Sequence, residues 1–171
     1  HSVRSLRAYL AATADLDHDW IPQFSVGGGA GLFGAYMTDA DVTFTAETSW
    51  AEESVCDWSD LDSLKPGSEN RWTESIRKGV TRGVELCDGD YLASTIAHFA
   101  PSDMANAARG NRLFLDLYDS PEQLRRLLSM CAQSTIWLQT ELRKIAPLVA
   151  GSDPSVPGSA GAGIWMPGEA P

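Results

Sequence analysis

The sequence predicts an α/β fold in which parallel strands alternate with helices. Strand-like apolar runs cover residues 20–26 and 91–99, and helical patterns follow the second run. The longest helical pattern begins at Pro121 and continues for about six turns. A doubly wound sheet and a (β/α) barrel both fit this order of elements.

Length and charge limit the classes of protein that fit. A chain of 171 residues is long enough for one domain with a substantial core. The net charge of −10 argues against a nucleic-acid partner and against docking on anionic lipid, since both need a basic surface. Apolar runs all stay well below the roughly 20 residues of a membrane span. A cytoplasmic location is expected, because three widely spaced cysteines are typical of reduced thiols.

The three cysteines predict neither a disulfide framework nor a metal site. Cys56, Cys87 and Cys131 are odd in number and widely spaced, without a CxxC pair. Cys131 falls on the apolar stripe of the longest helix, which predicts a buried side chain rather than a reactive thiol. Complete metal-ligand spacing is therefore not found in this sequence.

The first half of the chain predicts a helix, a strand, and then a second strand or hairpin arm before its main helix. Residues 2–13 repeat apolar side chains at helical spacing, and residues 41–50 alternate apolar and polar side chains. An acidic loop with a helical turn at residues 59–64 follows. Ser68 is the expected N-cap of a helix that continues to about Leu86.

The second half predicts one strand and two helices. Pro101 closes the strand, and Ser102 or Asp103 is expected to cap the next helix. Ser120, Pro121 and Gln123 form a strong start signal for the long helix. One face of that helix is predicted to be buried by Leu124, Leu127, Leu128, Cys131, Leu138, Leu142 and Ile145.

A glycine run raises the alternative of a dinucleotide site. Gly29, Gly31 and Gly34 form a GxGxxG pattern after the first strand. Only about eight residues separate Phe33 from Asp41, too few for the crossover helix of a βαβ unit. The other reading is a flexible glycine turn with backbone amides close to an anionic ligand.

A longer motif resembles a known family. Residues 97–128 read AHFAPSDMANAARGNRLFLDLYDSPEQLRRLL, with an Ala-Pro turn, an Arg-Gly helix end and a Pro-Glu helix start. This pattern resembles the central signature of the uroporphyrinogen decarboxylase superfamily, as do the segments WIPQFSVGGGAGLFGAY and GIWMPG. The resemblance implies a TIM barrel of which residues 1–171 form a single incomplete domain that lacks the C-terminal strands.

The resemblance implies one of two chemistries. Decarboxylase members act as lyases in porphyrin biosynthesis without a cofactor, and methyltransferase members move a methyl group between a corrinoid protein and a thiol, with zinc held by His and Cys. Where the decarboxylase has its aspartate this chain has Ser25, and Asn106 falls near the expected tyrosine. Methyl transfer is therefore the predicted function. A decarboxylase and a non-catalytic binding barrel remain alternatives.

Active sites of barrels lie at the C-terminal ends of the strands. His98 and Asp103 are the catalytic candidates, and Ser25, Arg109 and Trp165 are candidates for substrate binding. Three of these residues also have a structural alternative. His98 could be a core histidine, Asp103 a helix cap, and Arg109 the partner of Asp116 or Asp119 in an ion pair.

The implied partners follow from the same resemblance. They are a small carboxylate, a tetrapyrrole or a corrinoid protein, together with self-association into a homo-oligomer. Zinc ligands are expected outside this chain, and the resemblance leaves any other cofactor unknown.

Overall fold

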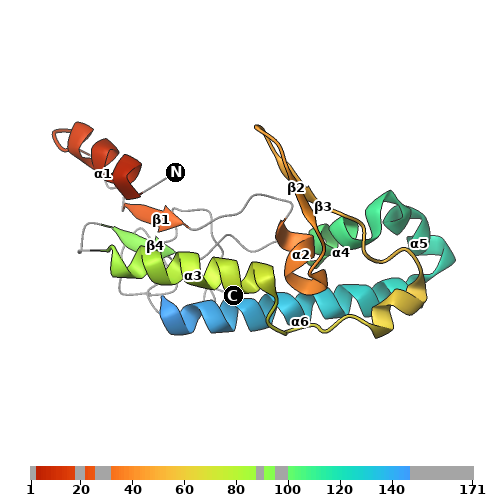
Figure 1. Ribbon diagram of the computed structural model, residues 1–171. Helices are drawn as coiled ribbons and strands as arrows, with labels where there is room; N and C mark the ends of the chain where they lie inside the picture. The colour runs from red at the N-terminus through yellow and green to blue at the C-terminus, as the bar shows by residue number, and fades with distance from the viewer. Residues whose placement is uncertain (1–2, 18–21, 26–31, 88–90, 95–99, 147–171) are drawn as a thin grey trace, which may run out of the picture. The chain divides into compact units, whose positions relative to one another are not determined.

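The computed structural model describes residues 3–17, 22–25, 32–87, 91–94 and 100–146. These residues divide between two compact units. The first unit takes its residues from 1–27, 77–97 and 141–171, and the second from 28–76 and 98–140. Helices predominate in the described residues, and the strands are short (Figure 1).

The first unit contains the parallel strand pair that the sequence predicts. Strand β1 (Gln23–Ser25) pairs with β4 (Leu92–Ser94), with Phe24 opposite Ala93. The Phe24 and Tyr91 rings lie 5.8 Å apart, and the buried Tyr91 hydroxyl donates to the Gly83 carbonyl at 2.8 Å. This bond ties the start of β4 to the helix that precedes it along the chain, α3 (Arg71–Glu85).

Helix α1 (Val3–Ala12) also belongs to this unit and confirms the helix predicted for residues 2–13. All of its side chains retain some exposure to solvent. The Arg7 guanidinium donates to the Leu86 carbonyl at 3.0 Å, just after the end of α3. This bond attaches α1 to the rest of its unit.

The second unit contains a hairpin that corrects the all-parallel expectation. Strands β2 (Val42–Phe44) and β3 (Ser49–Ala51) pair in antiparallel register, with Thr43 opposite Trp50. The connecting turn closes through a bond of 2.8 Å from the Thr45 amide to the Thr48 carbonyl. Four residues between two strands are enough for an antiparallel turn and far too few for a parallel crossover.

The remaining elements of this unit are helical, and α3 and α6 each extend into both units. They are α2 (Leu32–Thr38), the 3₁₀ turn η1 (Trp58–Asp62), α4 (Pro101–Arg109), η2 (Gly110–Arg112), α5 (Leu113–Asp119) and α6 (Pro121–Ile145). The predicted start of α6 at Pro121 is confirmed. Its predicted apolar face is largely confirmed as well, because Leu124, Leu127, Cys131, Leu138 and Leu142 are buried.

Helix α3 begins later than the sequence suggested, because its cap is Asn70 rather than Ser68. The Asn70 side-chain oxygen accepts from the amides of Trp72 and Thr73, both at 3.0 Å. The Asn70 amide nitrogen donates in turn to the carbonyls of Ala35 and Tyr36 in α2. A cap that also joins a second helix is stabilised beyond its local propensity, which explains why Asn70 is preferred.

The glycine run has a packing role at its last member. Gly34 lies inside α2, and a Cβ at this position would stand 2.7 Å from the Ala107 Cβ of α4. Figure 1 shows α2 beside α4, where only small residues permit this approach. Strand β2 follows α2 and pairs with β3 rather than with β1, so these described strands do not form the βαβ unit of a dinucleotide site.

Candidate functional site

The structure describes two of the five predicted site residues together with their side chains. Asp103 is exposed in the first turn of α4, and Arg109 is buried as its last residue. Ser25 ends β1, which is the predicted position, but its side chain lies outside the described set. His98 and Trp165 lie outside the described residues altogether.

The start of α4 corrects the predicted cap. The N-cap is Ala100, and Pro101 occupies the first helical position, so neither Ser102 nor Asp103 caps the helix. The Asp103 amide donates to the Ala100 carbonyl at 2.9 Å. Proline fixes its own φ near the helical value and lacks the N–H that a cap would satisfy, so the helix begins there. The Asp103 carboxylate then lies near the positive end of the helix dipole.

Arg109 is the centre of a buried polar cluster, which we call the Arg109 cluster: Arg109, Asp116, Val55, Cys56 and Trp58. The guanidinium donates to both carboxylate oxygens of Asp116, at 2.8 Å from Nε to Oδ2 and 3.2 Å from a terminal nitrogen to Oδ1. Its other terminal nitrogen donates to the Val55 carbonyl at 3.0 Å and the Cys56 carbonyl at 2.7 Å. The guanidinium carbon lies 4.2 Å from the centre of the Trp58 ring.

The geometry of this cluster is that of a structural clamp. The side chains of Arg109 and Asp116 are only 8% and 9% exposed, so water cannot replace their mutual bonds. Four of the five N–H donors of a guanidinium are engaged, and the fork-to-fork contact with a carboxylate is the strongest pairing arginine makes. The ion pair with Asp116 is one of the two alternatives that the sequence left open for Arg109. Binding of a substrate carboxylate by Arg109 stays a prediction.

The backbone strengthens the same clamp. The Ala108 carbonyl at the end of α4 accepts from the amides of Ser54 and Val55, both at 2.9 Å. Asn106 closes the helix end as well, because its carbonyl accepts from the Gly110 amide and its side chain donates back to the Gly110 carbonyl at 3.3 Å. The segment around Val55 therefore docks on α4 through both main chain and side chain.

Sequence reasoning missed the Val55 to Trp58 side of this cluster. From the sequence, Trp58 is expected to cover the core or to line a ligand cavity; in the structure it is half-buried and provides the ring face on which the Arg109 guanidinium lies. An aromatic residue in an acidic loop upstream of a buried arginine is too general a pattern to predict this contact. The loop and α4 are separated by more than forty residues, and only folding brings them together.

Gly110 is required by its backbone conformation, and this supplies a prediction. Its φ is 68° with ψ at −162°, a region that is essentially restricted to glycine. A Cβ would also collide with the Glu53 carboxylate, which is paired with Arg112 at 3.0 Å. We expect Gly110→Ala to lower the free energy of unfolding by about 1–3 kcal/mol, measured by urea denaturation.

Gly67→Ala is the matched comparison, because Gly67 also has a positive φ, of 73°, but its Cβ would stand no closer than 3.3 Å to Trp137. Glu53 is a half-exposed side chain whose carboxylate can move aside, so the loss in Gly110→Ala should come from the backbone conformation and be similar to that in Gly67→Ala. An unchanged stability of Gly110→Ala would contradict the requirement for glycine.

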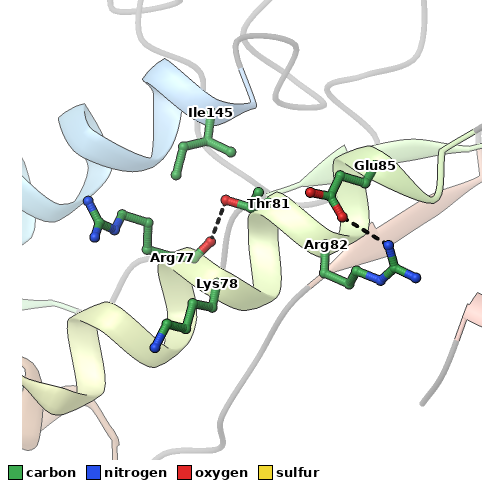
Figure 2. A pocket seen from close by; sticks show the side chains of 6 residues that line it. All are labelled: Arg77, Lys78, Thr81, Arg82, Glu85 and Ile145. Carbon is green, nitrogen blue, oxygen red and sulfur yellow. Dashed lines mark hydrogen bonds and ion pairs between the residues drawn. The ribbon is translucent and has the colours of Figure 1, made fainter.

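A separate pocket lies on the surface of the first unit. It has a volume of about 530 Å³ and is lined by Arg77, Lys78, Thr81, Arg82, Glu85 and Ile145. Figure 2 shows the Arg82–Glu85 ion pair, of 2.9 Å, and the Thr81 hydroxyl bonded to the Arg77 carbonyl. None of the predicted site residues lines this pocket, and its charged groups are exposed, so it does not qualify as the predicted active site.

The described residues do not provide a metal centre. No group of three or more His, Cys, Asp or Glu side chains comes together in the described part of the chain. Cys131 is buried as predicted, and burial raises the pKa of its thiol to about 12, so it stays protonated at neutral pH. The Cys87 thiol donates to the Tyr91 carbonyl at 2.7 Å. These residues do not fit a zinc site.

Two further observations bear on function. Among the described residues, every helix is too short or too polar to cross a lipid bilayer. Comparison of the chain with models of known protein families and with curated proteins gives no match. The resemblance to the uroporphyrinogen decarboxylase superfamily therefore stays a prediction.

Proposed function

We propose that this chain belongs to a (β/α)₈ barrel of the uroporphyrinogen decarboxylase superfamily and takes part in methyl transfer between a corrinoid and a thiol. The observation that carries the proposal is the Arg109 cluster. The motif residues on which the resemblance depends, Arg109-Gly110 and Asp116, are those that close the buried clamp and its glycine turn. The resemblance and the clamp therefore depend on the same residues.

The parallel pairing of β1 and β4 supports the barrel part of the proposal. Between these strands the chain contains α2, the β2–β3 hairpin, η1 and α3, and parallel pairing of strands joined by a helical connection is the arrangement that a barrel uses. A barrel takes about 250 residues, so the proposal requires further strands beyond the 171 residues of this chain.

We propose methyl transfer rather than decarboxylation because two residues expected in a decarboxylase, an aspartate and a tyrosine, are replaced in this chain. Ser25 ends the strand where the resemblance implies the aspartate of a decarboxylase. Asn106, in place of a tyrosine, is held by both of its hydrogen bonds to Gly110. Asp103 remains exposed at the start of α4 and available to a substrate or partner. Since no zinc site forms among the described residues, we assign none of their side chains a step that involves the metal.

The test is an assay of the protein with its downstream coding sequence included. We expect loss of the methyl–cobalt absorbance when the protein is mixed with methylcobalamin and a thiol, and no decarboxylation of uroporphyrinogen. Asp103→Asn should reduce the methyl-transfer rate about tenfold or more, since a positioned acid–base group contributes at least that much. Glu122→Gln, at an exposed carboxylate in the first turn of α6, is the matched control.

Three results would contradict the proposal. Turnover of uroporphyrinogen would favour the decarboxylase alternative, and tight binding of corrinoid or porphyrinogen without turnover would favour a binding barrel. A downstream sequence without a His-x-Cys motif and a later cysteine would also contradict methyl transfer, because the zinc that binds the thiol would then lack its protein ligands.

A further inference from the structure

Helix α5 buries a charged side chain and exposes most of its large apolar side chains, the opposite of an ordinary amphipathic helix. Its polar Asp116 is buried at 6% exposure, while four large apolar side chains face solvent. Their exposed fractions are 60% for Phe114, 66% for Leu115, 57% for Leu117 and 88% for Tyr118. We call these four residues the α5 patch. Single exposed apolar residues are ordinary, but a contiguous group on one short helix marks an interaction surface.

The Arg109 cluster explains how the helix is held in this orientation. Asp116 is drawn inward by its two bonds to the Arg109 guanidinium, and Leu113 is the buried apolar residue of the same helix. With these two residues fixed inside, the intervening and following side chains must point outward. The orientation of the patch is therefore rigidly set, as a docking surface requires.

The charges beside the patch are self-complementary. Arg112 precedes α5 and Asp119 is its last residue, and both are exposed. Seven residues are close to two helical turns, or about 10 Å, so the two charges lie on the same flank at opposite ends. Arg112 is also positioned by its bonds to Glu53 and the Cys56 carbonyl, both at 3.0 Å.

We propose that the α5 patch pairs with the α5 patch of a second copy of this chain, in antiparallel orientation about a two-fold axis. A two-fold interface places residue i against residue j and residue j against residue i. Arg112 of each copy then lies beside Asp119 of the other, and the apolar side chains cover one another. A parallel pairing would give neither charge contact. This proposal does not depend on the proposed function.

A single short helix gives a small interface, so the dimer should be weak. We expect the 171-residue chain to show a reversible monomer–dimer equilibrium with a micromolar dissociation constant in sedimentation equilibrium. Leu115→Glu should raise that constant about tenfold or more, because it places two like charges in an apolar contact. Ile136→Glu is the matched control, since Ile136 is also 66% exposed but lies about four turns into α6.

The charge contacts are tested separately. Asp119→Arg and Arg112→Asp should each weaken self-association, and an equimolar mixture of the two variants should form heterodimers more readily than either variant forms homodimers. A wild-type chain that stays monomeric into the high micromolar range overturns the proposal. So does a dimer that Leu115→Glu leaves intact, or one that Ile136→Glu weakens to the same degree. Circular dichroism checks that each variant keeps its helical content.

Discussion

Replacing Arg109 by methionine is expected to lower the free energy of unfolding by about 3–5 kcal/mol. The substitution leaves the Asp116 carboxylate buried at 9% side-chain exposure without its partner, and removes the donors to the Val55 and Cys56 carbonyls. Asp116→Asn should destabilise the protein for the converse reason, because the guanidinium then stays buried without a compensating charge. Urea denaturation monitored by circular dichroism measures both losses.

The double variant Arg109→Met, Asp116→Leu separates the cost of a broken pair from the value of an intact one. Replacing both buried charges by apolar groups is often close to neutral, so the double variant should be more stable than either single variant. Arg112→Gln is the control, because Arg112 also donates to the Cys56 carbonyl but is exposed, and it should have a much smaller effect. Additive losses in the double variant would contradict the buried clamp.

Leu127→Ala is the second change with a large expected effect. Leu127 is fully buried on the inner face of α6, at 0% exposure. Truncation to alanine leaves a cavity and should cost about 2–5 kcal/mol of unfolding free energy, with the denaturant slope unchanged. The measurement is again urea denaturation.

Ile136→Ala is the control for this change. Ile136 lies on the same helix but is 66% exposed, so its truncation should cost about 0.5 kcal/mol or less. Comparable losses at the two positions would show that the inner face of α6 is assigned wrongly.

Local patterns predicted α1, α3, α4 and α6 but neither α2 nor α5, and they placed the caps of α3 and α4 wrongly. The spacing of Leu124, Leu127 and Cys131 identified the buried face of α6, because helical periodicity is written directly in the sequence. The caps were wrong at α3 and α4, where several polar residues compete near each start. Asn70 prevails over Ser68 because it also bonds α2, a contact that no local pattern contains.

The candidate site shows the same division. An ion pair of Arg109 with Asp116 or Asp119 was one of two open alternatives, and the structure shows that the partner is Asp116 and that the pair is buried. The bonds from the same guanidinium to the Val55 and Cys56 carbonyls could not be predicted, because every residue has a main-chain carbonyl and the sequence does not show which ones will accept. Residues 41–50 were predicted as a strand or a hairpin arm, and the structure decides for the antiparallel hairpin of β2 and β3.

The sequence by itself determined α1, α3, α4 and α6, where α6 begins and which of its faces is buried, whereas α2 and α5 were not predicted. These follow from periodicity and from the fixed geometry of proline, which act over a few residues. Only the tertiary structure decided that Arg109 serves a clamp and that α5 turns its apolar side chains outward. Both depend on the buried ion pair between Arg109 and Asp116. A buried charge needs its partner, and keeping Asp116 inside beside Arg109 leaves the apolar side chains of α5 exposed.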